Sequence, residues 1–322
     1  MDEKLTKARL RRDMSKGGWT LLIYYVLMNL AVAVAGILEF SVSIAINGVE
    51  NVLLDQSQLQ AILNDGWGLI GAICIGAVLM LLWKKKEFCF HTIWQTNGSM
   101  TPGKFFAILS IFLGGQLVYS VLLSVFEWAF NLVGLTLTET AEQVSGASDT
   151  FSMFLYVGLF APVAEEILFR GLLLRMLRPY GKRFAILATA FLFAMFHGNF
   201  VQSPYAFVIG LVLGYVAVEY SMVWAMVLHM INNMLVSDAL MRVCDLLPPW
   251  MGELIFTLLL LGTAIAGVVI LICKRREIAQ YRREDPMHPW CVQSIFSAPG
   301  VLVFTAMMVM NMLLTISVLG AG

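Results

Sequence analysis

Long apolar runs alternate with short polar connections along the whole chain of 322 residues. A helix needs roughly 20 consecutive apolar residues to cross a hydrocarbon core about 30 Å thick. Nine runs are candidates for such spans: 18–45, 67–83, 105–126, 152–174, 184–197, 204–220, 222–236, 251–273 and 297–319. The fifth and seventh runs are short, so eight spans is the alternative count. The pattern predicts an all-α, polytopic transmembrane helical bundle.

Composition agrees with a membrane protein. Hydrophobic residues make up 59% of the chain and charged residues 13%, and the mean hydropathy is +0.81, which is far from the balance of a soluble domain. The formal net charge is zero, so nothing indicates a nucleic-acid partner. The five cysteines have no CxxC spacing and indicate neither a disulfide framework nor a cysteine-based metal site.

Basic residues orient the spans. Nearly all of the 21 Lys and Arg lie in four polar segments that fall on one side of a nine-span bundle: 4–16, 84–104, 175–183 and 274–283. Arg242 falls on the opposite side, and Arg170 falls inside a span. Because cytoplasmic loops carry an excess of Lys and Arg, we expect the N-terminus in the cytoplasm and the C-terminus outside. The predicted localisation is a multi-pass integral membrane protein of a bacterial-type plasma membrane.

Five ionisable residues lie at membrane depth: Glu165, Glu166, Arg170, His197 and His229. Charges in this position are costly and usually mark function. With a rise of about 1.5 Å per residue, Glu166 lies about 14 Å from the basic flank of its span, His197 about 20 Å and His229 about 12 Å. These three residues therefore share a depth near the middle of the membrane. The sequence predicts one buried polar site that carries acid–base or metal chemistry.

Local spacing suggests roles for the site residues. Glu166 and Arg170 are four apart on one helix and can form an ion pair. Glu165 is turned by roughly 100° and is left to face the histidines, which suits a general base acting on water. His229 and Asn233 are also four apart, so the amide can orient the imidazole or donate to a developing oxyanion.

The order of these residues resembles a known family of membrane enzymes. The motifs are Glu165-Glu166-x-x-x-Arg170, Phe193-x-x-x-His197 and His229-x-x-x-Asn233, on successive predicted helices. This pattern is similar to the CPBP family of intramembrane proteases, which includes type II CAAX prenyl proteases and bacteriocin-processing or immunity proteins. The resemblance covers roughly residues 150 to 240. It implies peptide-bond hydrolysis by water, with Glu165 as the essential glutamate and His197, His229 and Asn233 as the other polar site residues.

The resemblance also implies a possible cofactor, a partner and a division of the chain. Family members have been described as metalloproteases, and Glu165, His197 and His229 can hold a divalent ion, zinc being the candidate; the same residues can equally activate water without metal. We expect metal-associated chemistry. The expected substrate is a membrane-associated peptide or protein, either a prenylated one or a leader peptide. The protein is also expected to contact membrane lipid. Residues 151–240 would form the catalytic core, between N-terminal helices in 1–150 and C-terminal helices in 241–322.

Two other classes of function fit parts of the pattern. A transporter or proton-relay protein would use the same carboxylates and histidines to bind an ion or pass protons, although inverted repeats typical of many transporters are not evident in the sequence. A non-catalytic relative would bind a peptide as an immunity factor. Taken singly, Glu166 with Arg170 is as well explained by a structural ion pair, and each histidine by a satisfied core residue. The joint pattern favours the peptidase.

Overall fold

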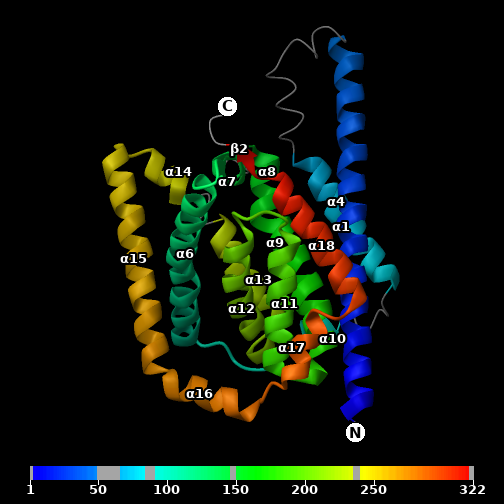
Figure 1. Ribbon diagram of the computed structural model, residues 1–322. Helices are drawn as coiled ribbons and strands as arrows, with labels where there is room; N and C mark the ends of the chain where they lie inside the picture. Colours follow the sequence, from blue (N-terminus) through cyan, green and yellow to red (C-terminus); the bar gives the residue numbers. More distant parts are fainter. Residues whose placement is uncertain (1–2, 49–65, 84–90, 146–149, 235–239, 319–322) are drawn as a thin grey trace.

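The computed structural model describes residues 3–48, 66–83, 91–145, 150–234 and 240–318. These residues form helices apart from one two-stranded sheet. Figure 1 shows most of the long helices side by side in one bundle, with short elements at its two ends. The all-α helical bundle predicted from the sequence is confirmed.

The N-terminal part of the chain supplies three long helices. Its elements are α1 (Glu3–Asn47), α4 (Trp67–Trp83), the 3-10 turn η1 (Thr92–Trp94), α6 (Pro102–Asn131), β1 (Leu135–Thr136) and α7 (Thr138–Ser145). The start of α6 is encoded locally, because the Thr101 side chain accepts a hydrogen bond from the Lys104 backbone N–H. Pro102 follows in the first turn, where its missing N–H costs nothing.

The fourth apolar run forms a composite helix. Its elements are α8 (Phe151–Leu155), η2 (Tyr156–Phe160), α9 (Ala161–Glu166), η3 (Ile167–Leu173), α10 (Leu174–Leu177) and the 3-10 turn η4 (Arg178–Tyr180). Both η2 and η3 are π-helical, a wider winding that often occurs at functional sites. Pro162, which lacks a backbone N–H, is the second residue of α9, in the turn that follows η2. The winding therefore changes on both sides of the two glutamates.

Three shorter helices follow and pack around the composite helix. They are α11 (Lys182–Phe196), α12 (Ser203–Glu219) and α13 (Met222–Met230), and α11 packs against α12. The Ser221 side chain caps α13 by accepting from the Trp224 backbone N–H. At the other end of α11, Gly198 has a φ of 61°, a left-handed conformation that glycine adopts readily. This turn ends α11 directly before His197.

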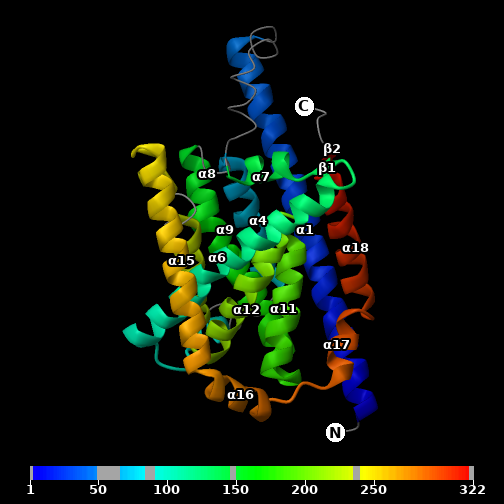
Figure 2. The same cartoon turned by 60° about the vertical axis from the view of Figure 1, so that its left-hand side comes forward.

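The C-terminal part of the chain borders the bundle on two sides. Its elements are α14 (Leu240–Asp245), α15 (Pro249–Cys273), α16 (Arg275–Glu284), α17 (Pro289–Ile295), α18 (Pro299–Leu314) and β2 (Ser317–Val318). α15 packs against α6, whereas α18 runs beside α1, as Figure 2 shows. β2 pairs antiparallel with β1, with Leu135 opposite Val318 and Thr136 opposite Ser317.

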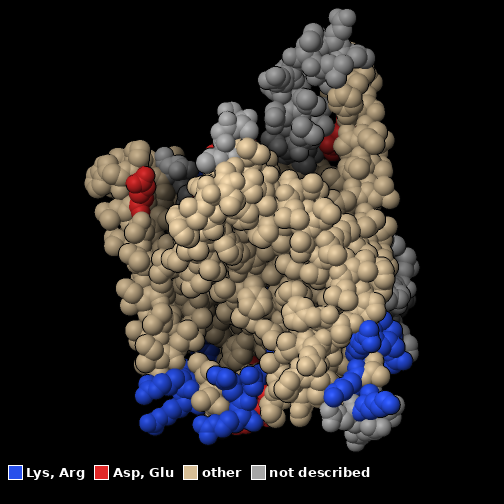
Figure 3. All heavy atoms as spheres, viewed as in Figure 1, with Lys and Arg blue, Asp and Glu red and all other residues tan. Residues whose placement is uncertain are grey.

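Within the described residues, three helices are long and apolar enough to cross a membrane: α1, α6 and α15. α17 and α18 together would make a fourth span, bent by 57°. The other predicted spans are helical but shorter or interrupted. Figure 3 shows that the Lys and Arg side chains gather at the end of the molecule that holds the N-terminus. The protein therefore has the helices and the one-sided charge of an integral membrane protein.

Candidate active site

A buried ion pair forms the base of the site. Glu166 at the end of α9 and Arg170 in η3 are both fully buried, and Nη1 of Arg170 lies 2.8 Å from Oε1 of Glu166. Nη2 of Arg170 donates to the Gly210 carbonyl of α12 at 3.3 Å. The ion pair predicted from the four-residue spacing is confirmed. Because both charges are out of water, each depends on the other, and the pair joins the composite helix to α12.

His229 of α13 lies between the two glutamates. Its Nδ1 is 3.0 Å from Oε1 of Glu166, and its Nε2 is 3.7 Å from Oε2 of Glu165. A carboxylate accepts hydrogen bonds, so the proton of a neutral His229 belongs on Nδ1. Nε2 is then left with a free lone pair facing Glu165.

The two adjacent carboxylates have different surroundings. The Glu165 side chain is 22% exposed, whereas that of Glu166 is 0% exposed. Within the described part of the chain, Glu165 accepts no hydrogen bond, and it faces Nε2 of His229 at 3.7 Å. Glu166 already accepts hydrogen bonds from both Arg170 and His229. Glu165 is therefore the carboxylate that water or a substrate can reach.

His197 reaches the same cluster from the end of α11. Its Nδ1 is 2.9 Å from the Phe193 carbonyl oxygen, and a carbonyl only accepts, so this nitrogen carries the proton. The imidazole also lies within electrostatic range of Glu165, His229 and Arg170. Like His229, His197 therefore keeps Nε2 free of hydrogen bonds to other described residues.

Phe193 is the apolar centre of the cluster and is fully buried. The Arg170 guanidinium lies 4.4 Å from the centroid of its ring. The ring also makes edge contacts with His197 at 4.8 Å and His229 at 5.8 Å between centroids. One aromatic ring thus contacts the cation and both imidazoles.

Asn233 lies beside the cluster but does not contact His229 through a hydrogen bond. Its Nδ2 donates to the Val157 carbonyl of η2 at 2.9 Å, and its Oδ1 accepts from Nδ2 of Asn232 at 3.0 Å. The orientation of His229 comes instead from Glu166. Asn233 therefore ties the turn after α13 to the π-helical turn η2.

The sequence did not single out the polar chain that holds Asn232. Oδ1 of Asn232 accepts from Nε2 of Gln116 on α6 and from the Tyr205 hydroxyl on α12. Asn232 thus joins Gln116 and Tyr205 to Asn233, and Asn233 continues the network to the Val157 carbonyl of η2. Their spacing in sequence carries no signal, since they come from separate helices, and only the polarity of Gln116 inside an apolar run could have drawn attention to them.

The metal expected from the sequence needs three converging donors. Among the described residues, no group of three His, Cys, Asp or Glu side chains lies in an arrangement that could hold an ion. The donor chemistry of Glu165, His197 and His229 suits a divalent cation, but as placed these side chains do not converge.

The fold and the site together define a class of protein: a helical membrane protein with a carboxylate–imidazole cluster inside its bundle. Residues 147–235 match the family model of the type II CAAX prenyl endopeptidases described as Rce1-like. The matched segment contains all six site residues. This match confirms the resemblance to CPBP-type intramembrane proteases inferred from the motifs. No curated protein and no solved structure is significantly similar to the chain.

Proposed function

We propose that the protein is an intramembrane endopeptidase that cleaves a peptide bond of a membrane-associated or lipidated peptide. The observation that carries the proposal is the position of His229, with Nδ1 on the buried Glu166 and Nε2 toward the accessible Glu165. A purely structural ion pair would need neither the histidine nor a second glutamate that makes no hydrogen bond. The family match over residues 147–235 supports the same reaction class.

Glu165 acts as the general base in this proposal. A water molecule attacks the carbonyl carbon of the scissile bond while one of its protons passes to the Glu165 carboxylate. The carbonyl oxygen gains negative charge, and collapse of the tetrahedral intermediate breaks the C–N bond. Glu165 then gives the proton to the leaving nitrogen, so the products are a carboxylic acid and an amine.

The histidines orient the water. With both Nδ1 protons committed to Glu166 and to the Phe193 carbonyl, the two Nε2 atoms are hydrogen-bond acceptors. One of them can hold the attacking water by one of its protons, while the other proton of the water points to Glu165. Glu166 and Arg170 have no direct contact with the substrate in this scheme, and they position His229 and the composite helix.

A divalent ion is a separate proposal, with Glu165, His197 and His229 as its ligands. It requires these three side chains to come closer together than in the structure. When bound, such an ion would polarise water or the carbonyl group.

The proposed topology has nine spans with the N-terminus in the cytoplasm of a cell with a bacterial-type plasma membrane. It is supported by the gathering of Lys and Arg at one end of the bundle (Figure 3) and by the positive-inside rule. In a variant with the native cysteines replaced, Gln280→Cys on α16 should react with a membrane-impermeant maleimide only after the cells are opened. Val133→Cys, near the other end, should react in intact cells. The reverse pattern would invert the topology.

Cleavage by purified variants tests the catalytic assignment. Glu165→Gln, His197→Ala and His229→Ala are each expected to lower kcat by at least about 100-fold while the protein remains folded in detergent. His91→Ala, an exposed histidine outside the matched segment, and Glu253→Gln on α15 serve as matched controls. If all three site variants retained turnover, the peptidase assignment would be wrong, and a transporter or a peptide-binding immunity factor would be the remaining class.

A further inference from the structure

Hydrolysis of a peptide needs a hydrogen-bond donor for the oxygen on which negative charge develops. The imidazole and amide donors of the cluster are already committed. The Nδ1 protons of His197 and His229 bind Phe193 and Glu166, and the Asn233 amide binds Val157 and Asn232. A hydroxyl donor would complete the site. Tyr24 and Tyr156 both lie within electrostatic range of Glu165, and of these two tyrosines it is Tyr24 that lines the cavity between α1, α4 and the composite helix.

Tyr24 of α1 occupies a suitable position. Its hydroxyl makes no hydrogen bond to any residue that the structure describes, and it lies within electrostatic range of the Glu165 carboxylate. Tyr24 is 123 positions before the matched segment begins, so no motif connects it to the site. The hydroxyl is not among the buried polar atoms that lack a partner, so it is accessible and can donate a hydrogen bond to another molecule.

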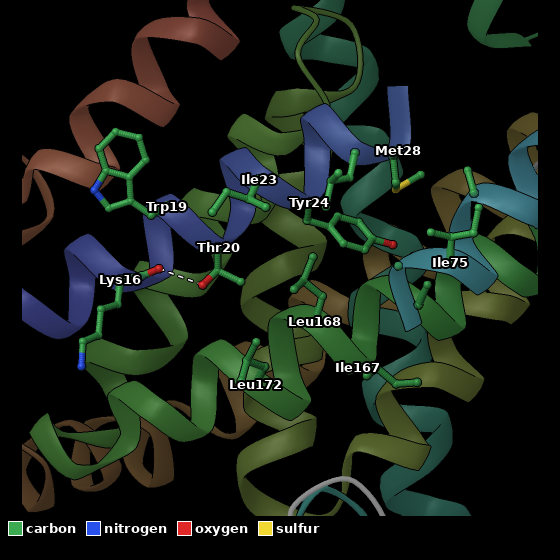
Figure 4. A pocket seen from close by; sticks show the side chains of 14 residues that line it. Lys16, Trp19, Thr20, Ile23, Tyr24, Met28, Ile75, Ile167, Leu168 and Leu172 are labelled. Carbon is green, nitrogen blue, oxygen red and sulfur yellow. Dashed lines mark hydrogen bonds between the residues drawn. The ribbon is translucent and has the colours of Figure 1, made fainter. Parts of the chain in front are cut away.

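A cavity leads to this hydroxyl. It has a volume of about 420 Å³ and lies between α1, α4 and the composite helix. Ala164 and Ile167, on either side of the glutamates in sequence, line it together with Tyr24. Figure 4 shows the Tyr24 ring projecting from α1 toward the composite helix, near Ile75, Ile167 and Leu168. Lys16 lies at the other end of the lined stretch of α1, toward the basic face of the molecule.

The position of the Tyr24 ring is fixed by its neighbours. On α4, a Cβ atom added to Gly76 would lie 2.5 Å from Cε2 of the ring, so only glycine leaves space for it. On the other side, the ring lies 6.0 Å from that of Phe196, next to His197 in sequence. The tyrosine is thus placed by packing, with its hydroxyl free.

We propose that the cavity between α1, α4 and the composite helix admits an apolar stretch of the substrate peptide, and that the Tyr24 hydroxyl donates a hydrogen bond to the scissile carbonyl oxygen beside Glu165. This inference rests on the proposed peptidase function. The tyrosine keeps its proton throughout. The hydrogen bond strengthens as the oxygen becomes negatively charged in the tetrahedral intermediate and weakens when the carbonyl of the product forms. The apolar lining selects a peptide with hydrophobic side chains near the cleaved bond.

Replacement of the hydroxyl tests the proposal. Tyr24→Phe removes one oxygen and keeps the ring, so we expect kcat to fall about 100-fold with KM changed by less than about threefold, because the bond forms mainly in the transition state. Tyr25→Phe is the matched control. Tyr25 is the next residue of α1, and its hydroxyl accepts a hydrogen bond from Asn311 of α18 at 2.6 Å, away from Glu165. Removal of the Tyr25 hydroxyl should leave kcat unchanged.

A pair of glycine variants tests whether the position of the Tyr24 ring matters, without removing a polar group. Gly76→Ala should push the Tyr24 ring aside and reduce kcat as Tyr24→Phe does. Gly71→Ala on the same helix has no atom within 4 Å of the new methyl group and should be fully active. In the double variant Tyr24→Phe/Gly76→Ala, the two losses should not multiply.

The outcomes separate this inference from the function on which it rests. If Glu165→Gln abolishes cleavage and Tyr24→Phe keeps the wild-type kcat, the peptidase stands and the role of Tyr24 is wrong. If Tyr156→Phe, the other tyrosine within electrostatic range of Glu165, loses kcat in its place, the donor is Tyr156 and the proposal is again wrong. If no Glu165-dependent cleavage occurs with any membrane peptide, both proposals are rejected together.

Discussion

Nδ1 of His229 lies 3.0 Å from Oε1 of Glu166, an oxygen that also receives the Arg170 guanidinium at 2.8 Å. One carboxylate oxygen therefore neutralises the buried cation and orients the imidazole. The second oxygen of Glu166 and Nε of Arg170 have no hydrogen-bond partner among the described residues. The ion pair is held by a small number of contacts, and its stability depends on the charge of Glu166.

Glu166→Gln is expected to destabilise the protein strongly. The substitution leaves the fully buried Arg170 without a counter-charge, and breaking a buried pair in this way costs about 3–5 kcal/mol. The measurement is the unfolding free energy in mixed micelles, titrated with a denaturing detergent.

Glu165→Gln is the matched control for this loss. Its side chain is partly exposed and accepts no hydrogen bond from the described residues, so the unfolding free energy should change by less than about 1 kcal/mol. Both variants should be inactive. Equal stabilities for the two variants would show that the Glu166–Arg170 pair does not contribute as inferred here.

Phe193→Leu should weaken the whole cluster. The leucine keeps an apolar side chain but removes the ring that contacts Arg170, His197 and His229. We expect a loss of about 2 kcal/mol in unfolding free energy from the cation–π and edge contacts, together with at least a tenfold fall in kcat. Phe191→Leu on the same helix is the control, because its ring contacts Phe296 of the C-terminal part. A fall in kcat of the same size in both variants would contradict the role given to Phe193.

Local spacing predicted the parts of the site that one helix or one span determines. The Glu166–Arg170 pair follows from a separation of four residues, and the charge cost of a bilayer identified the glutamates and histidines as one set. The pairing of Asn233 with His229 did not form. Residues 231–234 and both flanks of α9 are π-helical, so the residues that share a face differ from those of an α-helix, and Asn233 turns to the Val157 carbonyl instead.

Contacts between distant helices could not be predicted from the sequence for a different reason. Tyr24, Gln116 and Tyr205 each lie in apolar runs whose period shows only that they are helical. The side of the helix that faces the site depends on how α1, α6 and α12 pack against the composite helix. That packing is set by many side chains together, and no short motif records it.

The polar chain through Asn232 predicts a graded series of stabilities. Asn232→Ala removes the acceptor of both Gln116 and Tyr205 and the donor to Asn233, and it should cost about 2–3 kcal/mol, since buried partners are left unsatisfied. Tyr205→Phe removes one of these bonds and should cost about 1 kcal/mol. Detergent unfolding of the two variants gives the comparison, with Tyr205→Phe keeping most of the activity. An Asn232→Ala protein as stable as the wild type would show that the hydrogen bonds through Asn232 do not stabilise the bundle.

Chelation tests the separate metal proposal. The metal-free activation of water predicts that protein dialysed against a strong chelator keeps its kcat, in line with the absence of a three-ligand arrangement of Glu165, His197 and His229 among the described residues. Elemental analysis of the same sample should find less than one divalent ion per ten chains. Loss of cleavage with rescue by zinc alone would establish the ion. A His197→Ala variant would then show whether the ion is held at this site. Loss of one of only three ligands should lower the zinc affinity at least tenfold. The control His91→Ala should leave the zinc affinity unchanged.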